Sequence, residues 1–435
     1  MSAPWADREL HLIGVGGAGM SGYATAAVAL GARVSGSDQS DGPTLDALRV
    51  LGVAVHVGHD AANVPAGDVE VVYSSAVPAE NPERTAARER GLREVPRAAL
   101  LGELSALKRT IAVAGAHGKT TTSSMVAHVL VETGRRPAYL IGGELRTTGR
   151  NAEWGEGEWL VVEADESDRS MLALDVDVAV VTNVELDHHA TYGSLEEVRQ
   201  VFREFLAAPE HAVLWDRADV VALRGGRDAI PFDLPDPPLR LLVPGEHNQR
   251  NAAAAVEAAV IAGVTREEAV AALARFPGAG RRFERLGTTA SGAEVVDDYA
   301  HHPTEVAATI AAAHTLGARR VVAIFQPHLF SRTRALAREF GAALAEADLP
   351  VVLDVYPARE HPLDFPGVSG YLVAEAAADA RPGHPVLWLR DFAAAEQVLG
   401  PRLRAGDLCL VMGAGDVHVL GRRLVGGSSA PSGSR

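Results

Sequence analysis

Short, continuous runs of apolar residues alternate along the chain with longer stretches in which apolar residues recur at helical spacing. Continuous apolar runs are typical of strands that are covered on both faces, and strands that alternate with helices indicate parallel α/β domains. The pattern therefore predicts an α/β protein. The clearest of the predicted strands are His11–Val15, Arg33–Ser37, Val71–Ser74, Thr110–Val113, Trp159–Val162, Val178–Thr182, Arg320–Phe325, Pro350–Val355 and Asp407–Met412.

Three segments have the strand, turn and helix pattern with which nucleotide-binding domains begin: Leu12–Gly19, Ile111–Thr122 and the chain from Val295 to Pro303. We therefore place domain boundaries near residues 100 and 288. The stretch Pro231–Pro244 is rich in proline and is predicted to be a loop. The tail over residues 426–435 is rich in glycine and serine and is predicted to be disordered.

The composition excludes several classes of function. Acidic residues (56) outnumber basic residues (41), and the formal net charge of −15 argues against a nucleic-acid or anionic-membrane binder, because phosphate surfaces attract basic proteins. The single cysteine, Cys409, excludes an intrachain disulfide and a multi-cysteine metal site. The N-terminus has no basic-then-apolar signal, and no run of about 18 apolar residues occurs, so we expect a cytoplasmic protein without a membrane span.

Residues 14–19 read Gly-Val-Gly-Gly-Ala-Gly and match the G-x-G-x-x-G pattern between a predicted strand and a predicted helix. Glycines at these positions let backbone amides approach a diphosphate at the helix N-terminus. Asp38 ends the next strand, at a spacing suited to a ribose contact. The pattern alone is weak in a chain with 43 glycines. It is compatible with a diphosphate site, with an NAD site, and with a tight turn that binds nothing.

Residues 115–121 read Gly-Ala-His-Gly-Lys-Thr-Thr and form a shortened P-loop, since the full pattern would have a glycine at Val113. Lys119 is one of only two lysines among 41 basic residues. A compact ammonium fits a phosphate cradle better than a planar guanidinium does. We expect backbone amides to hold the β-phosphate, Lys119 to bind the γ-phosphate and the Thr120 hydroxyl to ligate Mg²⁺. The chain is therefore predicted to use ATP.

Two polar segments follow strands of the same predicted domain. Residues 163–168 read Glu-Ala-Asp-Glu-Ser-Asp, and carboxylates at a strand end can complete a Mg²⁺ shell. We expect Asp168, however, to be a solvated loop residue. Residues 182–189 read Thr-Asn-Val-Glu-Leu-Asp-His-His, and His188 is a candidate metal ligand or phosphate contact.

Later segments offer further candidate contacts. Asn248 and Asn251 fall one turn apart on one helix face, where two carboxamides can read the edge of adenine; alternatively, Asn248 only caps the helix. Arg282 is either a γ-phosphate clamp or part of a charged surface turn. His328 and Arg332 follow a predicted strand and could clamp a carboxylate, because ligands bind at the carboxyl ends of strands in α/β sheets.

Together these motifs resemble the Mur ligase family from about residue 10 to residue 422. The resemblance is specific because many motifs occur in the order that the family has. They are the glycine-rich start, Ser-Ser-Ala at 74–76, the lysine loop at 115–121, Glu-Ala-Asp-Glu-Ser-Asp at 163–168, Asn-x-Glu-x-Asp-His at 183–188, His-Asn-x-x-Asn at 247–251, Arg-Arg-Phe-Glu at 281–284, Asp-Asp-Tyr-Ala-His-His-Pro-Thr-Glu at 297–305 and Gln-Pro-His-x-x-Ser-Arg-Thr at 326–333.

The resemblance implies a Rossmann-like N-terminal domain over residues 1–100 that binds a UDP-sugar, a P-loop-type central ATPase domain over 101–288 that binds ATP and Mg²⁺, and a Rossmann-like C-terminal domain over 289–425 that brings an amino acid. The implied UDP-sugar contacts are Gly16, Gly17, Ala18, Gly19, Asp38, Ser74 and Ser75. The implied ATP contacts are Gly115, His117, Gly118, Lys119, Thr120, Thr121, Asn248, Asn251, Arg282 and Asp298. The implied metal ligands are Thr120, Glu163 and His188, the implied catalytic residues are Lys119, His188 and Arg282, and the implied amino-acid contacts are Tyr299, His301, His328 and Arg332.

The activity that the resemblance implies is ATP-dependent ligation of L-alanine to the lactyl carboxylate of UDP-N-acetylmuramate, through an acyl phosphate, in peptidoglycan precursor synthesis. These two small molecules are the expected partners, and we expect a monomer or a weak homodimer. One alternative is a family member that joins a ready-made peptide to UDP-N-acetylmuramate during wall recycling. Another is an NAD(P)-dependent oxidoreductase, which would leave the lysine loop unexplained. A non-catalytic nucleotide-binding regulator would leave the metal and acceptor groups without a purpose.

The chain departs from the family pattern at two places. Leu329 stands where several relatives carry arginine, which removes one expected contact to the alanine carboxylate. The stretch Trp215–Gly245 is shorter than in many members, at the place of a small accessory sheet. In addition, no lysine follows Lys119, which excludes the carbamylated lysine with which some Mur ligases hold a second metal.

Overall fold

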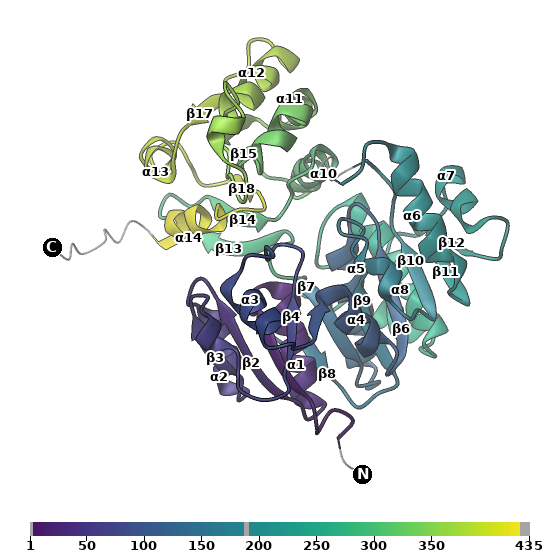
Figure 1. Cartoon of the computed structure of the whole chain (residues 1–435). Coiled ribbons are helices and arrows are strands. Elements are labelled where there is room, and N and C mark those ends of the chain that lie inside the picture. The colour runs from purple at the N-terminus through teal and green to yellow at the C-terminus, as the bar shows by residue number, and fades with distance from the viewer. Residues whose placement is uncertain (1–2, 187–190, 427–435) are drawn as a thin grey trace. The chain divides into compact units, whose positions relative to one another are not determined.

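The computed structural model describes residues 3–186 and 191–426, whose strands form three β-sheets flanked by helices (Figure 1). The predicted α/β fold class is confirmed. The chain divides into two compact units, one with the chain up to Leu241 together with Gln249–Pro277, and one with Leu242–Asn248 together with the chain from Gly278. The first unit contains two sheets and the second unit contains one. The domain boundaries near residues 100 and 288 stay a prediction.

The first sheet is parallel and has the strand order β3-β2-β1-β4-β5. Leu12 of the central strand pairs with Gly36 on one side and with Val72 on the other. Because the order reverses at β1, the carboxyl end of β1 is the place where doubly wound sheets bind ligands. The strands are β1 (Glu9–Ile13), β2 (Arg33–Asp38), β3 (Ala54–Val57), β4 (Glu70–Tyr73) and β5 (Glu94–Pro96), and the helices are α1 (Ala18–Ala29), α2 (Pro43–Val50), η1 (Ala61–Asn63), α3 (Pro82–Glu89) and α4 (Arg97–Ser105).

The second sheet has the order β12-β11-β10-β6-β9-β7-β8, and its strands are parallel except for the antiparallel hairpin of β7 and β8. Its central strand β6 is apolar and buried, as expected for a strand covered on both faces. The strands are β6 (Arg109–Ala114), β7 (Ala138–Leu145), β8 (Arg150–Trp154), β9 (Trp159–Glu163), β10 (Val178–Val181), β11 (His211–Trp215) and β12 (Ile230–Phe232). The helices are α5 (Lys119–Glu132), η2 (Ser170–Ala173), α6 (Leu195–Ala207), α7 (Ala218–Val221), η3 (Ala222–Arg224), α8 (Glu246–Ile261) and α9 (Arg266–Leu273).

The third sheet has the order β13-β14-β18-β15-β16-β17, with β13 antiparallel to β14 and the other pairs parallel. Met412 of β18 pairs with Asp298 of β14 and with Phe325 of β15, so the segments that follow these strands leave the sheet at one edge. The strands are β13 (Glu284–Thr288), β14 (Glu294–Asp298), β15 (Arg320–Phe325), β16 (Leu349–Leu353), β17 (Leu387–Leu389) and β18 (Asp407–Met412). The helices are α10 (Pro303–His314), α11 (Phe330–Leu344), η4 (Pro362–Asp364), α12 (Gly370–Ala380), α13 (Phe392–Leu399) and α14 (His418–Gly426).

Every one of the clearest predicted strands is present, but the first begins and ends two residues earlier than predicted. The chain leaves β1 at Gly14, which has φ +76°, and the N–H groups of Gly14 and Val15 both donate to the carbonyl of Ser37. Strands β3, β8 and β17 are short or half-exposed, and their apolar runs are short or interrupted, which is why the pattern did not predict them. Beyond β12, residues 233–245 contain neither a helix nor a strand.

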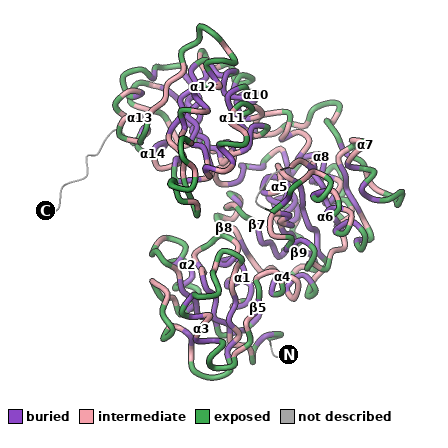
Figure 2. The backbone as a smooth tube through the Cα atoms, turned by 45° about the horizontal axis from the view of Figure 1, so that its top comes forward, coloured by how far each residue is buried: buried purple, intermediate pink, exposed green. Residues whose placement is uncertain are grey.

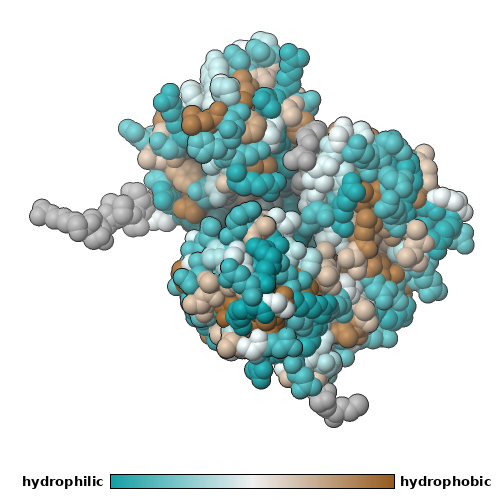
Figure 3. All heavy atoms as spheres, in the orientation of Figure 1, coloured by the Kyte–Doolittle hydropathy of each residue, from teal (hydrophilic) through white to brown (hydrophobic). Residues whose placement is uncertain are grey.

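In each unit the strands are largely buried and the outer faces of the helices are exposed (Figure 2). The face seen in Figure 3 is mainly hydrophilic, with apolar side chains in small groups. Within the described ranges, no helix combines the length and the apolar character that a membrane crossing requires.

Helix α1 connects the two sheets of the first unit by packing against the β7–β8 hairpin. Gly22 permits the close approach, because a Cβ atom there would lie 3.2 Å from the Cβ of Ala152 and 3.4 Å from a methyl carbon of Leu140. The amide of Asn151 also donates to the carbonyl of Ala18 at 2.9 Å. The glycine-rich start of α1 is therefore held at the second sheet as well as at its own.

We predict that Gly36→Ala destabilises the protein and that Gly42→Ala does not. A Cβ atom on Gly36 would lie 2.6 Å from the carbonyl oxygen of Leu12 and 2.9 Å from Val15, whereas Gly42 has nothing within 4 Å. Overpacking of this kind costs about 1–3 kcal/mol, and an open surface site stays within about 0.5 kcal/mol. Urea unfolding midpoints measure both variants, and equal midpoints for the two would contradict the prediction.

Candidate active site

The loop between β6 and α5 requires glycine at two positions. Gly115 has φ +140° and Gly118 has φ +82°, both in the region that residues with a side chain rarely adopt. A Cβ atom at Gly115 would lie 2.1 Å from the hydroxyl of Thr182, and one at Gly118 would lie 2.6 Å from the carboxamide oxygen of Asn251. The loop is therefore packed too closely for any side chain, and its backbone amides lie at the N-terminus of α5, where an anion is stabilised.

The residues that follow β10 hold this loop in place. The backbone N–H of His117 donates to Asn183 Oδ1 at 3.0 Å, and Asn183 Nδ2 donates to the carbonyl of His117 at 2.9 Å. Thr182 Oγ1 donates to the carbonyl of Ala114 at 3.2 Å. His117 also places its Nε2 atom 3.3 Å from a carboxylate oxygen of Glu185. The loop is thus fixed by the neighbouring strand and not by its own sequence alone.

Lys119 is the first residue of α5, and its side chain folds back over the loop. Its Nζ atom donates to the carbonyl of Gly115 at 2.6 Å and to both carboxylate oxygens of Glu166, at 2.9 and 3.1 Å. Burial opposes the charged form, but the carboxylates of Glu166 and Asp165 outweigh burial and raise the pKa of Lys119. The ammonium is therefore charged at neutral pH, and it lies against the carbonyl of Gly115 in the loop.

Two of the three predicted metal ligands lie together. Thr120 Oγ1 donates to Glu163 Oε2 at 3.1 Å, and Glu163 Oε1 accepts from the N–H of Gly142 at 2.6 Å. Adjacent ligands of one octahedral Mg²⁺, each about 2.1 Å from the ion, are about 3 Å apart. A hydroxyl and a carboxylate at this separation therefore fit Mg²⁺. His188, the third predicted ligand, lies outside the described residues, and Thr121 is buried in the first turn of α5.

The glycine-rich loop after β1 is in contact with Asp38 at the end of β2. The N–H of Gly16 donates to Asp38 Oδ2 at 2.9 Å. Gly16, Gly17 and Asp38 line one hollow of about 390 Å³ together with residues 40–45. Ser74 and Ser75 follow β4, with Ser74 half-buried and Ser75 exposed, and neither lines this hollow.

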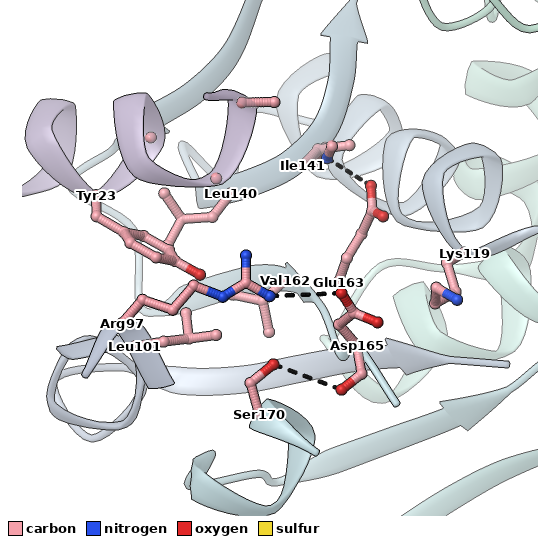
Figure 4. Close-up of a pocket in the computed structure, with 14 residues that line it drawn as sticks. Tyr23, Arg97, Leu101, Lys119, Leu140, Ile141, Val162, Glu163, Asp165 and Ser170 are labelled. Carbon is pink, nitrogen blue, oxygen red and sulfur yellow. Dashed lines mark hydrogen bonds and ion pairs between the residues drawn. The ribbon is translucent and has the colours of Figure 1, made fainter. Parts of the chain in front are cut away.

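A second pocket, of about 150 Å³, joins the two sheets of the first unit (Figure 4). The start of α1 contributes Ala18 and Gly19 to it, and the second sheet contributes Lys119 and Glu163. Figure 4 shows Lys119 and Glu163 on one side and Arg97 on the other. The lining therefore combines residues from two predicted sites, one for a UDP-sugar and one for ATP.

Arg97, the first residue of α4, is a pocket residue that sequence reasoning missed. Its guanidinium lies 2.9 Å from Asp168 and 3.4 Å from Asp165. Asp168 is therefore not the solvated loop residue that we expected, because it pairs with an arginine of α4. Tyr23 of α1 lines the same pocket, and burial raises the pKa of its hydroxyl to about 12.

The two asparagines predicted to read adenine are both buried residues of α8. Asn248 donates from Nδ2 to the carbonyl of Pro244 at 2.6 Å. Because α8 begins at Glu246, Asn248 lies inside the helix and does not cap it. The interpretation of Asn248 as an N-cap is therefore wrong, while the proposed contact with adenine stays a prediction.

The predicted amino-acid contacts form one cluster in the second unit. The ring of Tyr299 lies 5.2 Å from the ring of His301, which lies 6.3 Å from the ring of His328. Arg332 Nη1 lies 3.5 Å from His328 Nδ1. Arg282 joins the cluster, with its guanidinium 5.2 Å from the ring centre of Tyr299.

The structure adds two residues to this cluster. Tyr356 stacks on His328, with a centroid distance of 5.8 Å and an angle of 13° between the rings. Glu305 lies 3.2 Å from His301 Nδ1 and 3.6 Å from Arg282. Glu305 stands in a recognised motif, but Tyr356 has no signal in the sequence, because it reaches the site through the pairing of the segment after β16 with residue 328. Leu329 has φ +68°, and its N–H donates to the carbonyl of Tyr356.

Asp298, the predicted ribose contact, is a buried carboxylate that already accepts two hydrogen bonds. Its Oδ2 accepts from the N–H of Phe283 and its Oδ1 from the N–H of Ala300, each at 2.8 Å. Burial raises the pKa of Asp298 to about 6, although the charge of Arg282 and both backbone donors favour the ionised form. The carboxyl group therefore titrates close to neutral pH.

These features are those of an α/β protein with a shortened P-loop between β6 and α5 and with two oxygen atoms, of Thr120 and Glu163, that fit Mg²⁺. Three domain profiles match the chain, described as the catalytic domain of the Mur ligase family over residues 9–109, the Mur ligase middle domain over 113–225 and the Mur ligase glutamate ligase domain over 281–415. The chain belongs to the Mur ligase family.

Relatives match over nearly the whole chain. The UDP-N-acetylmuramate–L-alanine ligase of Streptomyces coelicolor is 43% identical over an alignment of 457 positions, which covers 97% of this chain and 98% of that protein. The ligase of the same name from Kineococcus radiotolerans is 48% identical over an alignment of 453 positions, which covers 95% of this chain and 94% of that protein. The crystal structure of UDP-N-acetylmuramate–alanine ligase from Thermotoga maritima superposes with a TM-score of 0.81 at 27% identity, over 96% of this chain and 98% of that one.

We predict that the stability of the wild type, relative to Asp298→Asn, falls as the pH rises from about 4 to about 6. The folded state keeps the Asp298 proton up to about pH 6, whereas an unfolded aspartate loses it near pH 4. The unfolded state thus binds fewer protons in this window, so the free energy of unfolding decreases by on the order of 3 kcal/mol and stays low at higher pH. Chemical denaturation of both proteins between pH 4.5 and 8 measures the difference. A difference that does not change with pH would contradict this prediction.

Proposed function

We propose that the chain joins L-alanine to the lactyl carboxylate of UDP-N-acetylmuramate at the expense of ATP, in the synthesis of peptidoglycan precursors. Relatives that are 42–48% identical over nearly their full length carry the name UDP-N-acetylmuramate–L-alanine ligase. The structure of that enzyme from Thermotoga maritima also covers 96% of this chain. The class of chemistry is ATP-dependent amide formation, and ATP and Mg²⁺ are the proposed cosubstrate and metal.

The observation that carries the proposal is the pocket shared by the start of α1 and the lysine loop (Figure 4). A ligand that binds by its diphosphate at Gly16–Gly19 can extend from there toward Lys119 and Glu163. An acid that must react with the γ-phosphate of ATP needs this arrangement, because the two reacting atoms have to meet within about 3.5 Å. An oxidoreductase would need no triphosphate loop at the end of its cofactor site.

The chemistry proceeds in two displacements. A lactyl carboxylate oxygen attacks the γ-phosphorus of ATP, which gives an acyl phosphate and releases ADP. The amine of alanine then attacks the acyl carbon, phosphate leaves with the bonding electrons, and the nitrogen loses its proton. Both partners of the first displacement are anions, so Lys119 and the amides at the start of α5 act by neutralising charge and aligning the phosphate. Mg²⁺, held by Thr120 and Glu163, would supply further neutralisation of the phosphates.

The remaining roles belong to the same proposal. Arg282 is proposed to bind the terminal phosphate, Asn248 and Asn251 the adenine, and Asp298 the ribose of ATP. Tyr299, His301, His328 and Arg332 are proposed to bind alanine, with His188 as the third metal ligand. The apolar side chain of Leu329 cannot pair with a carboxylate, so the proposed cation for the alanine carboxylate is Arg332, which lies beside the ring of His328.

Phosphate release from ATP with UDP-N-acetylmuramate tests the reaction. We expect release to depend on L-alanine, with glycine and serine slower, and to stop in excess chelator, because the phosphate charges then lack their metal. The peptide L-alanyl-γ-D-glutamyl-meso-diaminopimelate is the comparison acceptor. Faster phosphate release with the peptide than with alanine would indicate a peptide-recycling ligase instead. Undiminished release in excess chelator would contradict the proposed dependence on Mg²⁺.

The two lysines give a matched pair for the lysine loop. We expect Lys119→Ala to lower turnover by at least about 10²-fold, which is the scale for the loss of one preorganised electrostatic contact. Lys108→Ala removes the same charge outside the loop, where Lys108 donates to the carbonyl of Gly157. Turnover of this variant should stay within about twofold of the wild type. Circular dichroism checks that both variants fold. Turnover of Lys119→Ala within a few-fold of wild type would refute the role of the ammonium.

A further inference from the structure

Glu83 carries a fully buried charge that the proposed chemistry does not use. It lies in the first turn of α3, and its side chain has 0% exposure. Its Oε2 accepts from Ser37 Oγ at 2.6 Å and lies 3.4 Å from His11 Nε2. Its Oε1 accepts from Asn63 Nδ2 at 2.8 Å. Burial opposes ionisation, but these partners outweigh burial and lower the pKa of Glu83 to about 2, so the group stays ionised at neutral pH.

A buried carboxylate that only fills space contributes little to the stability of a protein. Removing it from water is costly, and an apolar residue of similar volume often replaces such a group without loss of stability. Glu83 lines neither the hollow beside Asp38 nor the pocket beside Lys119. Its oxygens are also occupied by protein donors, including the N–H of Asp60 at 3.3 Å. Any effect of Glu83 on a ligand must therefore pass through its partners.

The first partner leads directly to the glycine-rich loop. Ser37, whose hydroxyl bonds to Glu83, uses its carbonyl to accept from the N–H of Gly14 at 2.8 Å and of Val15 at 2.9 Å. The next residue, Asp38, accepts from the N–H of Gly16 at 2.9 Å. The end of β2 thus holds three successive amides of the loop, and Glu83 holds the end of β2.

The second partner of Glu83, Asn63, also supports the end of β2. Asn63, which donates to Glu83, also donates to the carbonyl of Gly58 at 3.0 Å, and the N–H of Gly58 donates to the carbonyl of Asp38 at 2.7 Å. His59 places its Nδ1 atom 3.0 Å from Ser37 Oγ. Glu83 is therefore the common acceptor of two segments that fix the main chain at residues 37 and 38.

We propose that Glu83 is a positioning residue for the sugar-nucleotide substrate: its carboxylate holds Ser37 and the loop after β3, so that the glycine-rich turn stays fixed to the end of β2 and the N–H groups at the start of α1 are preorganised for a diphosphate. This inference rests on the proposed function, because it takes a UDP-sugar to be the ligand of the glycine-rich loop. Preorganised donors bind an anion without first being ordered, so their loss weakens binding of that ligand alone.

Glu83→Gln tests the proposal because it keeps the shape and removes the charge and one acceptor. Glu89→Gln, at the exposed end of the same helix, is the matched control. We expect Glu83→Gln to raise the dissociation constant of UDP, measured by calorimetry, at least tenfold. The KM for UDP-N-acetylmuramate should rise to the same extent, while kcat and the KM for ATP stay within twofold. Glu89→Gln should match the wild type.

Ser37→Ala keeps the proposal testable if Glu83→Gln does not fold. It removes one link to the carboxylate and leaves the carbonyl that accepts from Gly14 and Val15, so we expect about a threefold weaker binding of UDP. An unchanged dissociation constant of UDP in a folded Glu83→Gln variant or in Ser37→Ala overturns the inference. An equal loss of affinity for UDP and for ATP, in proportion to a lower melting temperature, also overturns it. Absence of alanine-dependent phosphate release in the wild type counts against the proposed function alone, because UDP binding is measured without turnover.

Discussion

The ammonium of Lys119 against the carboxylate of Glu166 is the interaction on which the arrangement of the nucleotide site depends. A buried ammonium is stable only with partners that replace its water, and Glu166 and the carbonyl of Gly115 supply them. The carbonyl of Gly115 belongs to the turn between β6 and α5, which is made over glycines with positive φ. The charge of Lys119 therefore lies on the same short loop as the amides at the start of α5. In the proposed function, a triphosphate would offer Lys119 a new anionic partner in place of Glu166.

A second constraint is the packing of α1 on the β7–β8 hairpin within the first unit. A side chain at Gly22 would crowd Ala152 and Leu140, so glycine favours this close approach. The contact brings the glycine-rich turn and the lysine loop to the lining of one pocket (Figure 4). Arg97 and its two aspartate partners strengthen the same junction, because they tie α4 to the acidic loop after β9. The two sheets of the first unit thus line one pocket together, as the proposed reaction between two ligands requires.

Carboxylates set the backbone at three places in this chain, and two of them, those of Asp298 and Glu83, are buried. Glu163 accepts from the amide of Gly142, Asp298 from those of Phe283 and Ala300, and Glu83 organises the end of β2. Glu163 and Asp298 are the last residues of β9 and β14, whereas Glu83 lies in the first turn of α3. The same environment affects the pKa values differently: hydrogen-bond donors lower the pKa of Glu83, whereas burial raises that of Asp298. The number and kind of donors around a carboxylate, not burial alone, decide its charge.

The sequence by itself determined the α/β class, the clearest strands, and the residues of the lysine loop, because continuous apolar runs and obligatory glycines are local properties. It also identified Thr120, Glu163, Tyr299, His301, His328 and Arg332 as site residues through motif resemblance, and the structure brings them into two clusters, although their roles stay proposals. It missed Arg97, Glu166 as the partner of Lys119, Tyr356 and the network of Glu83, and it took Asp168 to be solvated. These residues matter through contacts with chain segments that are distant in sequence. Such contacts exist only once the sheets are packed, so the tertiary structure alone decided them.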